Sequence, residues 1–356
     1  MKRNLYTGGI IIILLMIVSA VNAAAINKTM PENEQPNITE LTKGVYVIEH
    51  PDAFLGEPSG NTTVIIGSQK VLVVDAVWPI SARTDIELIR QWTDLPVSYV
   101  VNTHWHSDHN IGNKTYMDAF PGLSIIAQKE TKKDMDIVFK DYANMILGNQ
   151  KRMLSEGKIR GEPLSPEVRE IIEKRLPDME AQFEGYVYQP PTLMFEDELV
   201  IDLGGREVQI KHPGKGNTSG DAVVYLPEEK ILAAGDLLVH PFPYPYDGYP
   251  SEWIKTLETL GQLDIKTIVP GHGTVLHDKT YLYLVRDFFQ SAVSQMNKRM
   301  GEAGPALSRS LDLLKQGIDL SSFKTKFASN DEELLGYFDS ISEQVIKLVY
   351  QEAALR

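Results

Sequence analysis

The same succession of predicted elements occurs twice in this chain. Residues 64–75 (VIIGSQKVLVVD) predict a β-hairpin whose second strand ends in an aspartate, and a helix and a strand ending at Thr103-His104 follow. Residues 223–236 (VVYLPEEKILAAGD) predict a second such hairpin, followed by a helix and a strand that ends at Gly271-His272. This repetition indicates a duplicated half-fold. If the halves pack as two sheets, the strand ends can converge on one site.

The remaining segments are mostly helical. Residues 129–186 are rich in Lys, Glu and Met, with apolar positions three or four apart, and predict a helical insertion between the two β-rich halves. Residues 281–356 predict a helical C-terminal extension that either covers the core or forms a homodimer contact. The main domain is expected over 41–280, after a flexible lead-in at 24–40 that contains two prolines.

The N-terminus has the three parts of a secretory signal peptide. Two basic residues, Lys2 and Arg3, precede the apolar run 10–21, and small residues follow at 23–25. The run is shorter than the ~20 residues of a membrane span. We therefore expect cleavage after Ala23 and a periplasmic or secreted protein with no stable membrane anchor; a retained anchor is the alternative.

Charge and cysteine content exclude several classes of function. The 356 residues carry 35 Lys plus Arg against 48 Asp plus Glu, a net charge of −13. An acidic chain is a poor partner for phosphate backbones, so we expect no nucleic-acid partner. Because the chain has no cysteine, disulfides, cysteine nucleophiles and thiolate metal ligands are excluded.

Three histidines and one aspartate occur within six residues, His104-Trp105-His106-Ser107-Asp108-His109, directly after an apolar strand. A polar loop with chance histidines is the alternative, but the chain has only eight histidines in total. Imidazole and carboxylate donors without thiolate favour zinc, and less strongly iron or manganese.

The ordered set of these residues resembles the signature of the metallo-β-lactamase superfamily. The resemblance rests on His104-x-His106-x-Asp108-His109, on Asp75, on Gly235-Asp236 and on Gly271-His272-Gly273, and it covers about residues 42–277. It implies an α/β fold, an αββα sandwich, with a two-metal site at one edge.

The resemblance also assigns roles within that site. It implies that His104 and His106 hold the first metal and that Asp236 bridges both metals. The second metal would be held by Asp108, His109 and His272. Asp75 would orient a ligand histidine from behind, as carboxylates near metal-bound imidazoles do.

The sequence departs from the family pattern at Asn217. The family usually has a third histidine for the first metal at this position, within Gly216-Asn217-Thr218. Asn217 could bind weakly through its amide oxygen, the first site could stay underfilled, or another group such as His240 could reach in. A plain turn residue is the fourth reading, since Asn tolerates left-handed backbone.

These features predict an exported, zinc-dependent hydrolase that cleaves a carbonyl bond in a small molecule. The candidate substrates are a β-lactam, lactone, ester or thioester, and Asp108 is the expected catalytic residue. Trp105, His240, Tyr244 and Tyr246 either line a pocket for an apolar or ring-bearing group or simply pack. The alternatives are a non-haem iron oxygenase or reductase on the same fold, and a degenerate, non-catalytic metal-binding or scaffold protein.

Overall fold

A computed structural model describes residues 35–51, 59–159, 162–307 and 310–354. The predicted signal peptide, 1–23, and most of the predicted lead-in lie outside the described residues. The end of that lead-in is not loose, however. Strand β1 (Asn37–Thr42) begins inside it, because its backbone pairs antiparallel with β2 (Val45–Glu49).

The described residues form two main sheets, of which the larger has seven strands, in the order β1-β2-β3-β4-β5-β6-β9. Strands β3 (Thr62–Ile66) and β4 (Val71–Val74) form the first predicted hairpin. From β4 onward the pairing is parallel. The strands of this parallel part are β5 (Val97–Val101), β6 (Ser124–Gln128) and β9 (Leu193–Phe195).

The second sheet has five strands, in the order β10-β11-β12-β13-β14. Its members are β10 (Glu198–Asp202), β11 (Glu207–Lys211), β12 (Val223–Leu226), β13 (Ile231–Ala233) and β14 (Thr267–Val269). Strands β12 and β13 form an antiparallel hairpin, and β14 returns parallel to β13. The β3-β4-β5 unit has the same pairing, as the repeated sequence pattern indicates.

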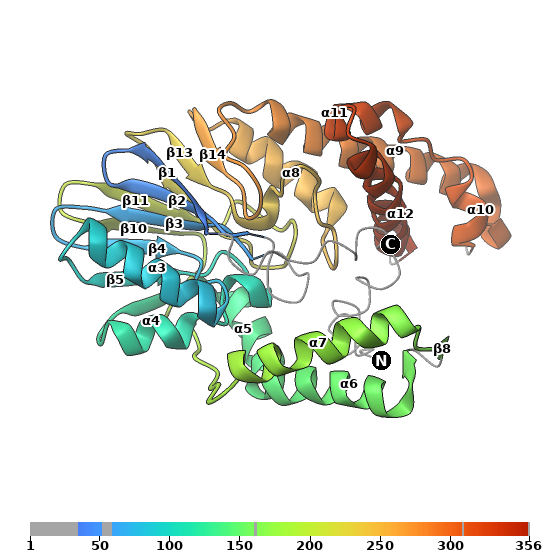
Figure 1. Cartoon of the computed structure of the whole chain (residues 1–356). Helices are drawn as coiled ribbons and strands as arrows, with labels where there is room; N and C mark the ends of the chain where they lie inside the picture. The colour runs from blue at the N-terminus through green and yellow to red at the C-terminus, as the bar shows by residue number, and fades with distance from the viewer. Residues whose placement is uncertain (1–34, 52–58, 160–161, 308–309, 355–356) are drawn as a thin grey trace.

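The sheets pack face to face, and helices cover their outer faces (Figure 1). Buried aliphatic side chains of both sheets, such as Leu72 and Leu226, fill the space between them. Helices α3 (Pro79–Trp92) and α4 (Asn113–Ala119) pack on the first sheet. Helices α8 (Pro250–Gly261) and α9 (Thr280–Leu307) pack on the second. The predicted αββα sandwich is thus confirmed.

Three helices occupy the stretch expected to be an insertion. They are α5 (Lys129–Val138), α6 (Tyr142–Glu156) and α7 (Pro166–Gln182), and the short strands β7 (Lys158–Ile159) and β8 (Glu162–Pro163) lie between α6 and α7. Helix α5 lies against the larger sheet, whereas α6 and α7 pair with each other below it (Figure 1).

The C-terminal helices extend the apolar layer outside the second sheet. They are α9, α10 (Leu311–Lys315), α11 (Lys324–Ala328) and α12 (Glu332–Ala354). Helix α9 buries one apolar stripe completely in this layer, so the extension covers the core; the stripe consists of Leu282, Val285, Phe288, Phe289, Ala292 and Met296. A homodimer contact through these helices stays a prediction.

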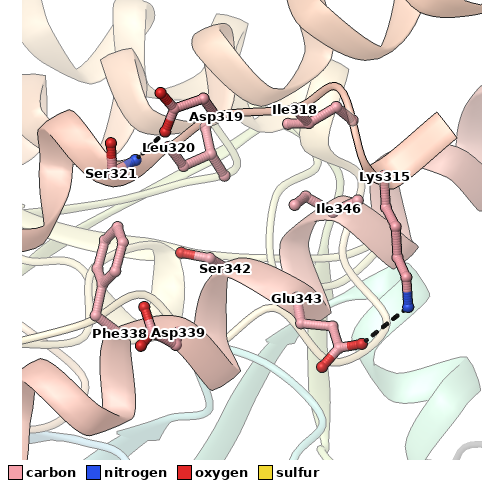
Figure 2. A pocket seen from close by; sticks show the side chains of 10 residues that line it. All are labelled: Lys315, Ile318, Asp319, Leu320, Ser321, Phe338, Asp339, Ser342, Glu343 and Ile346. Carbon is pink, nitrogen blue, oxygen red and sulfur yellow. Dashed lines mark hydrogen bonds and ion pairs between the residues drawn. The ribbon is translucent and has the colours of Figure 1, made fainter. Parts of the chain in front are cut away.

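A groove of about 340 Å³ lies between the segment after α10 and helix α12 (Figure 2). Its lining runs from Lys315 to Ile346 and includes none of the predicted site residues. Within the described ranges, no helix is long and apolar enough to span a membrane.

Phe288 is a direct test of this packing. Its ring is fully buried, and its centroid lies 5.2 Å from the ring centroid of Phe327 and 5.4 Å from that of Phe323. Phe288→Ala leaves a cavity, and we expect it to lower the free energy of unfolding by about 3–5 kcal/mol. Leu313→Ala is the control, because Leu313 is 45% exposed and its loss should cost no more than about 0.5 kcal/mol. Chemical denaturation measures both; equal losses would contradict the packing described.

Candidate metal centre

The described residues contain two groups of side chains suited to hold a metal ion. His104, His106 and Asp236 form the first group, and Asp108, His109 and His272 form the second. Within each group, one ligand atom from every residue lies within 4.8 Å of the others. Both groups consist of the residues that the sequence singled out.

Strand ends of both half-folds bring these residues together. His104 and His106 follow β5, and the short 3-10 helix η2 (Ser107–His109) carries Asp108 and His109. From the second half, Asp236 lies in the 3-10 helix η4 (Gly235–Leu237) after β13, and His272 follows β14. Each half-fold thus contributes donors to the same edge of the sandwich.

The Asp236 carboxylate lies between the two groups. Its Oδ2 is 3.6 Å from Nε2 of His104. Its Oδ1 is 3.2 Å from Nε2 of His109 and 3.5 Å from Nε2 of His272. One carboxylate therefore faces the imidazoles of both groups, as a bridging ligand does.

Asp75 supports the centre from behind. Its Oδ2 is 2.9 Å from Nδ1 of His109, and its two oxygens also accept hydrogen bonds from the backbone N–H and hydroxyl of Thr103. Nε2 of His109 is then directed at Asp108 and Asp236. This contact fixes the orientation of the imidazole and raises its basicity.

The charges of the centre are strongly coupled. Burial lowers the pKa of His104 well below its ordinary value, and the neighbouring imidazoles add to that effect. Burial also opposes charge on His109, but the carboxylates of Asp236, Asp108 and Asp75 outweigh it and raise the pKa of His109 well above its ordinary value. Burial disfavours the ionised form of Asp108, yet His109 and His272 lower the pKa of its carboxyl. The Asp108 carboxylate is therefore ionised at neutral pH.

The residues present fit a divalent metal. Nε2 of His104 is buried and has no hydrogen-bond partner among the described residues. Buried polar atoms are rarely left unsatisfied, and a cation would satisfy this one. Imidazole and carboxylate are donors that such ions accept. We conclude that this is a divalent-metal centre.

Close backbone approach requires glycine at two positions beside the centre. A Cβ on Gly271 would lie 2.0 Å from Oδ1 of Asp236, and a Cβ on Gly60 would lie 2.6 Å from Cε1 of His109. No side chain can occupy either position while the ligands stay in place.

Sequence reasoning missed Gly60-Asn61. Asn61 donates from Nδ2 to the carbonyl oxygens of Pro270 and Gly273, at 3.0 and 2.7 Å, and its backbone N–H donates to Gly271. These bonds hold the turn that carries His272. The dipeptide lies next to a predicted strand, but its contacts are more than 200 positions away, and no local pattern indicates them.

The other predicted site residues differ in position. Asn217 is fully buried beside His106 and Asp236. Trp105 is buried among the aromatic side chains that face the insertion. Tyr246 lies edge-on to His106, with ring centroids 6.2 Å apart, and Tyr244 packs against Tyr246.

His240 does not belong to either donor group, which corrects the suggestion that it reaches into the first site. Its ring packs edge-on against Tyr281, and its Nδ1 lies 3.2 Å from Oγ1 of Thr274. Its backbone N–H donates to the carbonyl of His272.

Replacing Asp75 with Asn tests its supporting role. If the Asn oxygen keeps the Thr103 backbone bond, its amide N–H₂ faces Nδ1 of His109, where a proton acceptor is needed. We expect metal affinity to fall 10–100-fold, measured by competition with a chromophoric chelator. Asp118→Asn, on the surface of α4, should leave the affinity unchanged. Unaltered affinity in Asp75→Asn would show that the Asp75 contact does not support the metal.

Comparison with known proteins gives the same assignment as the site. The family model described as the metallo-beta-lactamase superfamily matches residues 55–272. The metallo-beta-lactamase type 2 of Bacillus cereus is 25% identical over 292 residues, covering 77% of this chain and 94% of that protein. A linear primary-alkylsulfatase of Pseudomonas sp. is 25% identical over 202 residues, covering 54% of this chain and 37% of that protein.

Solved structures share the fold. The metallo-beta-lactamase from Pontibacter korlensis superposes with a TM-score of 0.51 at 18% identity, covering 72% of this chain and 99% of that one. The metallo-beta-lactamase IND-7 gives a TM-score of 0.51 at 17% identity, covering 73% of this chain and 100% of that one. The chain therefore belongs to the metallo-β-lactamase superfamily and is a metallo-hydrolase, because the family model matches most of it and the donor groups lie within the fold as described.

Proposed function

We propose that this protein is an exported, zinc-dependent hydrolase that cleaves a carbonyl bond of a small molecule, with a β-lactam as the first substrate to test. The observation that carries the proposal is the pair of histidine–carboxylate groups sharing Asp236. Zinc suits these donors best, because the centre has several imidazoles and no thiolate. The matched relatives include a metallo-beta-lactamase and an alkylsulfatase, both of them hydrolases, which does not favour the oxygenase alternative.

The chain's own residues define what the site does. When bound, zinc supplies Lewis acidity and lowers the pKa of a water from 15.7 to about 7. The carboxylate of Asp108, with its Oδ2 3.1 Å from Nε2 of His272, is 16% exposed, more than the side chains of His272 (10%), Asp236 (6%) and His109 (0%). It is ionised and partly open to solvent, so it is placed to orient a water and to accept its proton.

The surroundings of His106 favour a substrate with an apolar or ring-bearing group. Tyr246 lies edge-on to the His106 ring, with centroids 6.2 Å apart, and the buried Trp105 packs against the same ring at 4.6 Å between centroids. Tyr244 stacks edge-on against Tyr246 and extends this aromatic surface. An aromatic or alkyl substituent placed beside His106 would pack here.

Hydrolysis of a chromogenic cephalosporin by the zinc-loaded mature chain tests the reaction. We expect turnover that a chelator abolishes and that added zinc restores. Asp108→Asn keeps an oxygen donor but removes the proton acceptor, and at matched zinc content it should lower turnover by about 10²–10⁴-fold. The exposed surface variant Asp118→Asn should match the wild type.

Other outcomes would change the assignment. Zinc binding without cephalosporin turnover would exclude the β-lactam and direct the same assay to esters, lactones and thioesters. Full activity of Asp108→Asn would remove Asp108 from catalysis. A chain that binds no zinc would support the non-catalytic alternative.

Export is proposed from the sequence of the first 23 residues. In a Gram-negative host, we expect the protein in the periplasmic fraction, and mass spectrometry should find its N-terminus at Ala24. A full-length chain recovered in the membrane fraction would instead support the retained anchor.

A further inference from the structure

We propose that the two donor groups bind divalent metal with unequal affinity, and that the Asn217 amide is the weak additional donor of the His104–His106 group. This inference rests on the metal centre of the proposed function. It further implies that at limiting zinc the protein holds one metal, at the Asp108–His109–His272 group.

The first reason is the difference in charge between the groups. His109 and His272 both lie within 3.5 Å of two carboxylates, those of Asp108 and Asp236. In the first group, Asp236 is the only carboxylate within 4.0 Å of an imidazole nitrogen among the described residues, and it is shared; Asp247 acts on His106 only from a greater distance. A dication is therefore attracted more strongly to the second group.

The second reason is the support that each imidazole receives on its other nitrogen. In the second group, the Nδ1 of His109 contacts the Asp75 carboxylate at 2.9 Å. In the first group, the Nδ1 of His104 contacts only the neutral hydroxyl of Thr103, at 2.9 Å. Nδ1 of His106 faces Asn217, and its Nε2 has no hydrogen-bond partner among the described residues. A carboxylate behind an imidazole strengthens it as a ligand, and a hydroxyl does so less.

The position of Asn217 makes its amide the additional donor. Its Nδ2 lies 3.5 Å from Nδ1 of His106 and 3.4 Å from Oδ2 of Asp236, so the amide is directed at the donors of the first group. Its Oδ1 is buried and has no hydrogen-bond partner among the described residues. Rotating the side-chain amide by 180° would exchange the positions of Oδ1 and Nδ2 and would direct Oδ1 at the first group. This rotation would break no hydrogen bond to Oδ1, since Oδ1 makes none among the described residues. The neutral amide oxygen is nevertheless a weaker ligand for zinc than imidazole.

The loop holds Asn217 firmly, so the amide is already in position. The backbone N–H and hydroxyl of Thr218 donate to the Asp221 carboxylate. Helix α5 holds the same loop from the other side: Oγ of Ser219 donates to Asp134 at 2.9 Å, and Oγ1 of Thr131 donates to the carbonyl of Gly220 at 2.6 Å. A donor fixed by its neighbours loses little conformational freedom on binding.

Zinc titration of the metal-free mature chain, in competition with a chromophoric chelator, tests the inference without measuring activity. The wild type should bind two zinc ions in steps whose dissociation constants differ at least tenfold. Asn217→His should tighten the weaker step at least tenfold and leave the tighter step unchanged. Asn217→Ala should weaken the weaker step further.

Two controls separate ligation from general damage. His277→Ala removes an exposed histidine outside both groups, and its titration should match the wild type. Thermal unfolding of each metal-free variant shows whether the fold is retained. Equal affinities for both zinc ions in the wild type would overturn the proposal, as would a weaker step in Asn217→Ala that matches the wild type.

This result is separable from the proposed function. Two equal zinc affinities together with chelator-sensitive hydrolysis would contradict only the inference about Asn217. Absence of zinc binding in the wild type would remove the basis of both.

Discussion

The Asp236 carboxylate is the feature on which the rest of the centre depends. Its two oxygens face different groups of imidazoles, at 3.2 to 3.6 Å, so one side chain joins two ligand sets into one centre. A buried carboxylate is stable only when neighbouring groups compensate its charge. His109 and His272 do so here and lower the pKa of Asp236 against the effect of burial. A divalent cation would take over that compensation and release protons.

The fold brings this carboxylate to the imidazoles through its duplicated architecture. In each half-fold a pair of parallel strands, β4 with β5 and β13 with β14, ends at the same edge of the sandwich. The apolar layer between the sheets fixes the two halves relative to each other. The glycine at 271 lets the β14 turn approach Asp236 closely, and Asn61 ties that turn to the first sheet. The insertion contributes as well, because α5 bonds to the loop that carries Asn217.

Much of this could be predicted from the sequence, since the informative residues are local. The His104–His109 cluster and the aspartates at hairpin ends lie within short segments with clear periodicity. The repeated unit indicates a duplicated half-fold, and the resemblance to the superfamily implies the αββα sandwich. What the sequence did not reveal depends on contacts between distant segments. Asn61 acts on a turn at 270–273, and Thr131 and Asp134 act on residues 219–220. His240 was close in sequence to Asp236, but its ring packs on Tyr281 of α9 instead. Strand β1 lay in a region whose prolines suggested a loose segment, and its pairing with β2 decided its structure.

Anomalous diffraction at the zinc absorption edge, from crystals of the mature chain grown with excess zinc, tests the central claim most directly. The account predicts two anomalous peaks, one within the His104–His106 group and one within the Asp108–His109–His272 group, with an oxygen of Asp236 ligating each. A single peak at saturating zinc, or two peaks of which only one is ligated by Asp236, would contradict it.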